Sequence, residues 1–361
     1  MASNDHSGSN ALARAEALDA QGRHDDAINE LAMAAQRGDV EATTQLAKRI
    51  IVGDRAPRLR PQGIGLLRDA VSQGGAEAAD RLAVIVAAGA DGPPDWRAAV
   101  RLLGLAAERG WAPARGQLEV LASMLGNAAA AVGVEGDTRA RAAQLTRLLG
   151  DEPGLRQLLV PGGGSVLYAD PRICLFPGFV TPAVCAWLIE RSRGRLERAR
   201  VYDAAKQTDF VDSSRTNSAA IFHGMDADLV HLMVQARMSV ACAQPITHME
   251  APTVLHYGTG ETIGHHYDFV DPAHPNYAEE IRRSGNRIIT FLVYLNVGYE
   301  GGETDFPRLP FRHAGQLGEG LFFVNTLPDG QANLRTLHSG LPPARGEKWV
   351  FSQFIRNRSQ L

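Results

Sequence analysis

The sequence predicts an α+β protein in which an N-terminal α-helical repeat solenoid precedes a jelly-roll or barrel sheet. Three observations predict this order. Ala-, Leu- and Arg-rich sequence with helical spacing fills residues 11–125, a unit of 36 residues recurs within it, and short strand-like runs separated by Gly, Pro, Asn and Asp follow residue 250. Helices first and strands afterwards are typical of α+β folds. With 361 residues, the chain is long enough for two hydrophobic cores.

The 36-residue period is visible in three aligned stretches, AAQRGDVEATTQLA from Ala34, AVSQGGAEAADRLA from Ala70 and AAERGWAPARGQLE from Ala106. A helix, a glycine turn and a second helix with small residues make one solenoid unit. The pattern resembles Sel1-like repeats, relatives of the tetratricopeptide class, and a plain helical bundle is the alternative. The coinciding positions are Gly38, Gly74 and Gly110; Ala42, Ala78 and Ala114; Leu46, Leu82 and Leu118; Ile28, Ile64 and Val100; and Leu31, Leu67 and Leu103.

Glycine-rich stretches mark the borders of the predicted domains. Residues 1–10 are expected to be a disordered tail and 11–125 the repeats. Residues 126–168 are expected to be a linker with one helix in TRARAAQLTRLLG, and 169–358 the second domain. Solenoids present surfaces to peptides, so we expect a protein partner on the repeats and a part for them in substrate choice.

Composition excludes several classes of protein. The net charge of −3 and the lack of a basic run argue against a nucleic-acid or membrane-surface partner. Three widely spaced cysteines fit a reducing compartment. The N-terminus lacks the features of a signal peptide, and no apolar run reaches the roughly 18 residues of a membrane span. A cytoplasmic protein is therefore expected.

The second domain begins with helical sequence and continues with strands. TPAVCAWLIERSRG has a Thr cap followed by Pro, and DADLVHLMVQARMSVACA is a second predicted helix. The predicted strands after Glu250 are APTVLHY, HHYDF, RIITFLVYLN, GLFFVNT, TLHSG and KWVFSQFIR.

A metal site is predicted from GHHYDF, residues Gly264–Phe269. On a strand, His266 and Asp268 would share one face, because side chains two apart point the same way. The best third ligand is His338 in TLHSG, about 70 residues further on. Two histidines and one carboxylate leave open positions on iron(II), as in non-haem iron oxygenases, whereas a structural zinc site would need a fourth ligand, usually cysteine. We therefore predict iron(II) at His266, Asp268 and His338.

Open coordination positions require a co-substrate, and Lys348 indicates which one. This lysine lies in GEKW, ten residues after His338, between apolar strand residues. Burial of a lysine is costly unless it meets an anion. A dicarboxylic acid that binds the metal at one end supplies that anion at the other, so 2-oxoglutarate is the predicted co-substrate.

The order of the motifs gives a more specific resemblance over about half of the chain. The motifs from Arg215 to Trp349 come in the order RTNSAAIF, EAPTVLHYGTGE, HYD, RIITFLVYLN, EGGETDFP, the later histidine and GEKW, and His266 lies nine positions after Tyr257. This segment resembles the prolyl 4-hydroxylase-like family of iron(II)/2-oxoglutarate dioxygenases. The resemblance implies a double-stranded β-helix fold, with iron(II), 2-oxoglutarate and O2 as reactants and L-ascorbate as a candidate cofactor.

The resemblance also implies roles for particular residues. His266, Asp268 and His338 would bind iron, and Lys348 would bind the distal carboxylate of 2-oxoglutarate. Tyr257 and Thr304 match positions that assist the lysine, and Tyr294 is expected to point inward because it shares a strand face with Leu292 and Thr290. Positions that match Glu250 and Arg287 lie near the peptide substrate in the family.

One departure concerns the substrate. The family often has Tyr three residues before the first metal-binding histidine, and this chain has Ile263 there. The resemblance implies hydroxylation of a peptidyl residue, prolyl by default. The alternatives are a hydroxylase of a free or carrier-bound amino acid and, from another class, a helical-repeat adaptor with a degenerate dioxygenase domain. The intact triad and Lys348 argue against degeneracy.

Overall fold

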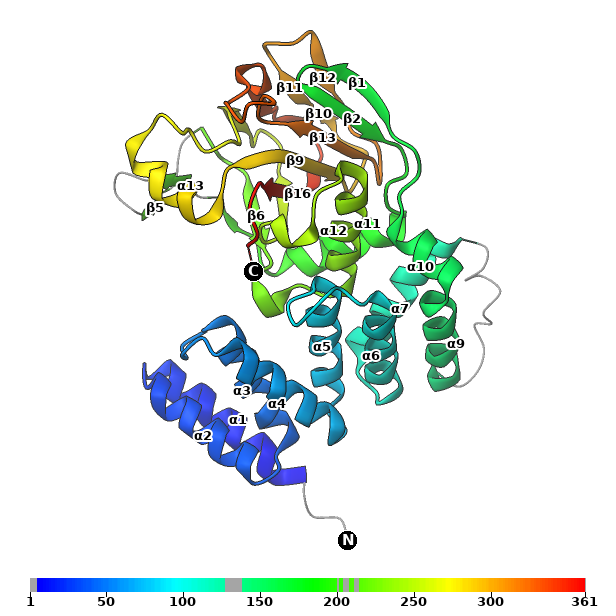
Figure 1. Cartoon of the computed structure of the whole chain (residues 1–361), viewed down its shortest axis with the longest axis vertical. Coiled ribbons are helices and arrows are strands. Elements are labelled where there is room, and N and C mark those ends of the chain that lie inside the picture. Colours follow the sequence, from blue (N-terminus) through cyan, green and yellow to red (C-terminus); the bar gives the residue numbers. More distant parts are fainter. Residues whose placement is uncertain (1–4, 127–137, 200, 204–207, 211–213, 361) are drawn as a thin grey trace. The chain divides into compact units, whose positions relative to one another are not determined.

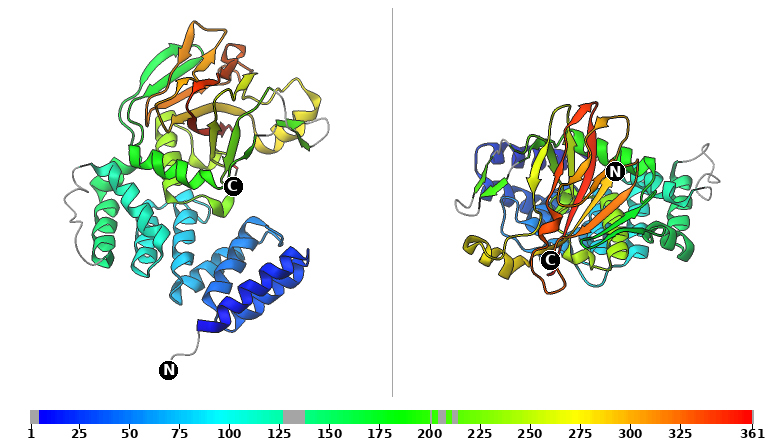
Figure 2. Two further views of the ribbon diagram at one scale, coloured as in Figure 1. Left: turned by 180° about the vertical axis from the view of Figure 1, so that it is seen from behind. Right: turned by 90° about the horizontal axis from the view of Figure 1, so that it is seen from above.

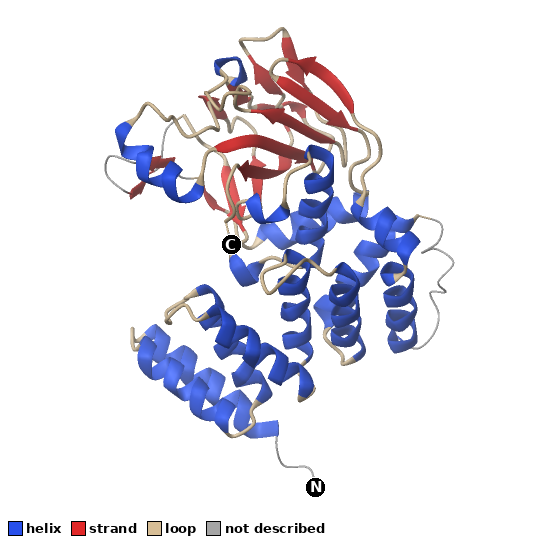
Figure 3. Ribbon diagram, viewed as in Figure 1, coloured by secondary structure: helices blue, strands red, loops and turns tan. Residues whose placement is uncertain are grey.

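The computed structural model describes residues 5–126, 138–199, 201–203, 208–210 and 214–360. It divides the chain into two compact units, one of residues 1–155 and 224–232, the other of residues 156–223 and 233–361. In the described part of the chain, the first unit is helical and every strand belongs to the second (Figure 1, Figure 3). The predicted α+β architecture is therefore confirmed.

Six helices of the first unit form three pairs that repeat with the predicted period. Gly38, Gly74 and Gly110 turn between the two helices of each pair with φ of +86°, +99° and +97°, in the left-handed region that favours glycine. The pairs are α2 (His24–Gln36) with α3 (Val40–Val52), α4 (Arg60–Ser72) with α5 (Ala76–Ala88), and α6 (Trp96–Glu108) with α7 (Ala112–Ala122).

The helix pairs pack through small side chains. Ala42, Ala78 and Ala114, the first apolar matches in the second helices, have no exposed surface. Small residues let neighbouring helices approach closely, which a regular stack of pairs requires. The stacked pairs follow one another in chain order (Figure 1). The solenoid, and not the plain bundle, is the architecture of this half.

Further helices flank the repeats. Helix α1 (Asp5–Ala20) includes residues 5–10, which the sequence assigns to a tail, and residues 1–4 lie outside the described part. Helix α9 (Thr138–Gly150) is the helix predicted in the linker, and α10 (Glu152–Leu159) follows it. No helix in the described part of the chain combines the length and the apolar character needed to cross a membrane.

The two helices predicted before the strands are both present, although the first turn of the second one clusters with the first unit. Helix α11 (Pro182–Arg193) begins after Thr181, whose side chain accepts a hydrogen bond from the main-chain N–H of Val184. Helix α12 (Leu229–Cys242) is shorter at its N-terminus than predicted. A short helix, α13 (Ala278–Ser284), comes later.

The strands form a large and a small sheet, seen from two further directions in Figure 2. The large sheet has the order β1-β2-β13-β9-β16-β7-β6-β3 and the small sheet β12-β11-β14-β8, and the pairs β10-β15 and β4-β5 stand apart. The large sheet contains β1 (Ser165–Ala169), β2 (Arg172–Phe176), β3 (Glu197–Arg198), β6 (Ser218–Ile221), β7 (Thr253–Tyr257), β9 (Arg287–Tyr294), β13 (Gly320–Val324) and β16 (Lys348–Arg356). The others are β4 (Val201–Asp203), β5 (Thr208–Phe210), β8 (Ile263–His266), β10 (Glu300–Gly301), β11 (Thr304–Phe306), β12 (Phe311–His313), β14 (His338–Gly340) and β15 (Pro343–Arg345).

One hydrophobic core lies between the large and the small sheet. Leu255, Leu292 and Val350 come from the large sheet, and Ile263 and Phe306 come from the small one. Two facing sheets with interleaved strand order make the jelly roll that the sequence predicts. This double-stranded β-helix positions the residues described next.

Candidate active site

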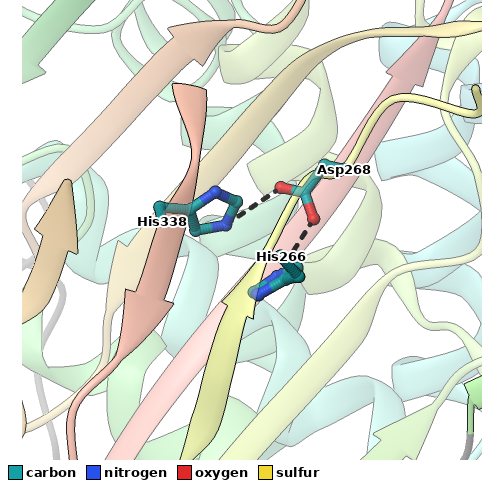
Figure 4. Close-up of side chains that lie close together, drawn as sticks. All are labelled: His266, Asp268 and His338. Carbon is teal, nitrogen blue, oxygen red and sulfur yellow. Dashed lines mark ion pairs between the residues drawn. The ribbon is translucent and has the colours of Figure 1, made fainter. Parts of the chain in front are cut away.

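Strand pairing brings two of the three predicted ligands together. Strands β8 and β14 are antiparallel neighbours, and His266 lies directly opposite His338. The predicted strand HHYDF is wrong in extent, because β8 ends at His266 and Asp268 lies beyond it. The chain nevertheless returns the Asp268 carboxylate to the two imidazoles, as Figure 4 shows.

The three side chains offer one ligand atom each within 4.8 Å of one another. Nε2 of His266 lies 3.3 Å from Oδ1 of Asp268, and Nε2 of His338 lies 3.3 Å from Oδ2. Asp268 and His338 are buried. Two imidazole nitrogens and one carboxylate at this spacing form the two-histidine, one-carboxylate triad of non-haem iron sites.

Main-chain carbonyls fix the tautomer of both histidines. Nδ1 of His266 donates to the carbonyl oxygen of Gly264 at 2.8 Å, and Nδ1 of His338 donates to that of Thr336 at 2.9 Å. Since a carbonyl oxygen only accepts, Nδ1 carries the proton in each ring. The Nε2 lone pairs are therefore free to bind a metal, which is the arrangement that metal-ligating histidines use.

A buried hydrogen-bond chain holds the carboxylate. The hydroxyl of Thr290 on β9 donates to Oδ2 of Asp268 at 2.7 Å, and Nδ2 of Asn325 donates to the Thr290 hydroxyl at 3.0 Å. Thr290 and Asn325 are buried. Because the amide of Asn325 donates to it, the Thr290 hydroxyl points its hydrogen at Asp268, which holds the carboxylate toward the histidines.

The electrostatics favour an ionised ligand set. Burial alone would raise the pKa of Asp268, but the neighbouring His338 and His266 hold it well below its usual range. Burial lowers the pKa of His338, and Asp268 more than offsets this and raises it. The pKa of His266 is lowered by burial and by His338. An anionic aspartate between two imidazoles is what a divalent cation needs.

Lys348 is a buried cation near this triad. Its side chain lies at the start of β16, opposite Tyr257 on β7. The ammonium donates to the carbonyl oxygen of Gly302 at 2.6 Å and lies 5.0 Å from the ring centre of Tyr257. In the described part of the chain, no carboxylate forms an ion pair with it. Burial lowers the pKa of Lys348 to about 8.

The tyrosines and the threonine expected beside Lys348 lie in the same core. The hydroxyls of Tyr294 and Thr304 share a hydrogen bond of 2.9 Å, and the ring centre of Tyr294 lies 5.7 Å from the Lys348 ammonium. Tyr257 packs against Gly340, where an added Cβ would lie 3.0 Å from its hydroxyl oxygen. The three side chains are buried.

Glu250 and Arg287 contact each other. Two nitrogens of the Arg287 guanidinium, Nε and Nη2, donate to the two Glu250 carboxylate oxygens at 2.7 and 2.9 Å. Arg356 donates to the same carboxylate at 2.6 Å. Burial alone would raise the pKa of Glu250, and the two arginines lower it. Glu250 therefore serves as a fixed anion that orients two cations.

Three side chains of the site received no role from the sequence. Thr290 and Asn325 support Asp268, and a polar residue in an apolar strand was the one available signal for Thr290. For Arg215, the sequence offers no signal beyond its place at the start of the RTNSAAIF motif. Its Nε is buried and has no hydrogen-bond partner in the described part of the chain. Burial lowers its pKa, opposed by the nearby Tyr257 and Asp268.

A jelly roll with a two-histidine, one-carboxylate triad and a buried lysine defines a non-haem iron(II) oxygenase that uses 2-oxoglutarate. Comparison with known proteins agrees with this class. Residues 252–356 match the 2OG-Fe(II) oxygenase superfamily. The chain is 30% identical over 213 residues to probable prolyl 4-hydroxylase 9 of Arabidopsis thaliana, covering 54% of this chain and 72% of that protein. The chain belongs to the prolyl 4-hydroxylase-like 2OG-Fe(II) oxygenases.

Two solved structures are similar to parts of the chain. The viral collagen prolyl hydroxylase of Paramecium Bursaria Chlorella virus-1, in its 2OG complex, is 26% identical, with a TM-score of 0.40 over 51% of this chain and 95% of that chain. A Sel1 repeat protein from Oxalobacter formigenes is 18% identical, with a TM-score of 0.27 over 37% of this chain and 53% of that chain.

Proposed function

We propose that this protein hydroxylates an unactivated C–H bond of a peptidyl residue, prolyl by default, with 2-oxoglutarate and O2 as co-substrates. The observation that carries this proposal is the triad together with a buried lysine that has no carboxylate partner in the described part of the chain. Iron(II) bound at the triad supplies the oxidising chemistry, in which 2-oxoglutarate becomes succinate and carbon dioxide. The protein binds and orients the substrates and excludes water from the site.

We assign the metal to Nε2 of His266, one carboxylate oxygen of Asp268 and Nε2 of His338. The support for this assignment is the set of fixed Nδ1 protons, which leaves both Nε2 atoms as donors to the metal. Three protein ligands on one side leave the remaining positions for co-substrates.

We assign the distal carboxylate of 2-oxoglutarate to Lys348. The buried ammonium has given up water for one carbonyl oxygen, so an incoming carboxylate restores what burial removed. The Tyr257 hydroxyl is a second donor to that carboxylate, and Thr304, through its bond to Tyr294, keeps the surrounding wall in place.

Substrate binding is assigned to Arg287 and Arg215. Glu250 occupies two nitrogens of Arg287 and leaves Nη1 to reach a main-chain carbonyl of a peptide. Arg215 has an unused buried Nε. We treat Glu250 as the residue that positions Arg287. A prolyl substrate also agrees with the similarity to probable prolyl 4-hydroxylase 9 of Arabidopsis thaliana. Ile263 makes the nearby wall apolar where the family often has tyrosine.

The first experiment measures succinate formed from 2-oxoglutarate with and without iron(II). We expect iron-dependent turnover in the natural protein and none in Asp268→Ala, which lacks the anionic ligand. Wild-type turnover and iron content in Asp268→Ala would refute the metal assignment. Loss of turnover in all forms would favour the adaptor alternative.

The second experiment separates peptide from amino-acid substrates. Proline-containing peptides, free proline and other free amino acids are incubated with the loaded enzyme, and mass spectrometry searches for the gain of one oxygen atom. Oxygen gained by peptides supports the proposal. Oxygen gained by free amino acids alone would establish the alternative hydroxylase.

A further inference from the structure

The helical unit contains a segment that is remote from the repeats in sequence. Residues Gly224–Leu232 cluster with residues 1–155 and not with the strands on either side of them in the chain. The segment includes the short helix η2 (Gly224–Asp226) and the first turn of α12. Ala227 and Asp228 join η2 to α12 outside any helix or strand.

Equivalent repeat positions make the polar contacts to this segment. Gln45, Arg81 and Gln117 follow one another at the period of 36 residues, each directly before the buried leucine of a second helix. Nη1 of Arg81 donates to the carbonyl oxygens of Met225 at 2.6 Å and Ala227 at 3.0 Å.

Gln117 completes the contact at the start of α12. Its Oε1 accepts a hydrogen bond of 2.9 Å from the N–H of Leu229. That N–H belongs to the first turn of a helix, where the main-chain donors have no partner within the helix. All of these contacts are made to main-chain atoms, which is how a protein binds a peptide backbone.

A buried aspartate orients both of these side chains. Oδ1 of Asp80 accepts from Nε2 of Gln117 at 2.8 Å, and Oδ2 accepts from Nε1 of Trp111 at 3.2 Å and pairs with Arg81. Asp80 is 0% exposed and Gln117 is 1% exposed. A buried charged network is costly unless every member has a partner. Here the segment supplies the carbonyl acceptors for Arg81 and the N–H donor for Gln117.

Apolar side chains of the segment are also buried. Leu229 and Val230 are completely buried. Met225 packs against the cluster that contains Ile64 and Leu67 of α4. The equivalent side chain in the first repeat behaves differently, because Nε2 of Gln45 donates to Glu77 of the next repeat at 3.0 Å. Two of the three equivalent positions therefore bind the segment.

We propose that the second helices of the repeats form a peptide-binding site whose ligand is residues 224–232 of the same chain. The second and third repeats supply its hydrogen bonds, and α3 of the first repeat packs against η2. The repeats then act in cis, and they hold the start of α12. An external partner that uses this face of the repeats must first displace the segment. The inference does not depend on the proposed reaction.

The test is hydrogen–deuterium exchange of the full-length chain, read by mass spectrometry. Gln117→Met keeps the volume of the side chain and removes both hydrogen bonds. We expect amide exchange in residues 225–232 to rise at least about tenfold, with α2–α4 unchanged, since local opening follows the loss of local contacts. Gln45→Met, at the equivalent repeat position whose amide donates to Glu77 and not to the segment, serves as the matched control and should leave residues 225–232 protected.

Three results would overturn the proposal. Unchanged exchange of residues 225–232 in Gln117→Met would mean that the segment is held by other contacts. An equal rise in Gln45→Met would mean that the effect is not specific to the site. A rise of the same size across α2–α7 would mean that Gln117 supports the helices and not the segment. Gln117→Asn keeps the amide but shortens the side chain, so it is a second test. It should also raise amide exchange in residues 225–232.

Discussion

The ammonium of Lys348 lost its water on burial and gained one carbonyl oxygen, that of Gly302. Burial therefore lowers its pKa to about 8. A bound carboxylate would stabilise the charged form and raise this pKa again. Under the proposed assignment, binding of 2-oxoglutarate is linked to a proton on Lys348 whenever the pH exceeds the pKa of Lys348 in the free protein.

The first prediction follows from the sign of this linkage. Below pH 8 the ammonium is already charged, so the Kd for 2-oxoglutarate should not change through this group. Above about pH 8 each binding event must add a proton, so the Kd should rise by up to about tenfold per pH unit. Isothermal titration calorimetry between about pH 6.5 and 9.5, with Co(II) in the metal site, measures the Kd for 2-oxoglutarate at each pH.

The control for this prediction is Lys348→Met. A charge-assisted hydrogen bond contributes on the order of 1.5–3 kcal/mol, so the variant should bind 2-oxoglutarate at least about tenfold more weakly. Its Kd should also lose the rise above pH 8. A rise that persists in Lys348→Met would assign the proton to another group.

The second prediction concerns Thr290, whose hydroxyl joins Asn325 to Asp268. Thr290→Val removes the hydroxyl at nearly constant volume and frees the carboxylate to turn. Partners of metal ligands typically change affinity about 10–100-fold, so we expect Co(II) affinity to fall by this factor. Titration followed by the Co(II) absorption spectrum measures it.

Thr290→Ser is the matched variant because it keeps the hydroxyl and loses only a methyl group. Its Co(II) affinity and spectrum should stay close to those of the natural protein. Equal losses in the valine and serine variants would show that Thr290 acts through packing and not through its hydrogen bond.

At the scale of elements, the site depends on how tightly neighbouring segments approach Tyr294 on β9. A Cβ added at Gly315 would lie 2.0 Å from the Tyr294 ring, and that tyrosine is completely buried between the sheets. A distance this short requires one of the two segments to move. Tyr294 in turn holds Thr304 of β11.

The third prediction is that Gly315→Ala lowers the free energy of unfolding by about 1–3 kcal/mol, the usual cost of overpacking a core. The displaced Tyr294 should also weaken 2-oxoglutarate binding. Gly163→Ala is the control, because a Cβ there meets no atom within 4 Å. Urea denaturation of the two variants provides the comparison, and equal stabilities would contradict the argument.

The strands and helices follow the sequence closely where one local pattern dominates. Strand β16 has the predicted bounds, Lys348–Arg356, and α9 has the predicted bounds, Thr138–Gly150. Strand β8 is shorter than predicted, and Asp268 reaches the histidines from beyond its end. The alternation of side chains along a strand therefore predicted the correct pair of ligands, His266 and Asp268, although the strand itself ends before Asp268.

At the scale of the whole molecule, Arg237 on α12 determines where the chain can be divided. It is buried, and its guanidinium donates to the main-chain carbonyls of Gln157, Leu158, Val160 and Phe179. Burial lowers its pKa to about 10. Three of its four acceptors lie in or directly after the C-terminal half of α10, so this half belongs with the unit that carries the site.

The fourth prediction compares two truncated proteins. Removing residues 1–151 keeps α10, and removing residues 1–160 leaves the Arg237 cation with one acceptor. A buried charge that loses its partners costs roughly 3–5 kcal/mol. We expect the longer deletion to have the lower Tm. Both should retain Lys348 and the triad, so 2-oxoglutarate should stabilise whichever form is folded. Equal Tm values for the two proteins would contradict the role of Arg237.

The sequence by itself determined the repeat period, the order of helices and strands, and the set of residues His266, Asp268, His338 and Lys348. These features depend on the spacing of residues within short stretches, and this spacing can be read from the sequence without the fold. The sequence also predicts an anion beside Lys348, because a charged side chain among apolar strand residues is costly to bury without one.

Only the tertiary structure decided which remote side chains support the site and what the repeats bind. Asn325 reaches Asp268 through Thr290, Glu250 is shared by two arginines, and Arg81 holds main-chain carbonyls far along the chain. Each of these contacts joins segments that are far apart in the sequence, and no repeating sequence pattern relates the two segments. Their meeting depends on the path of the backbone between them, which the packing of both cores fixes and no local pattern encodes.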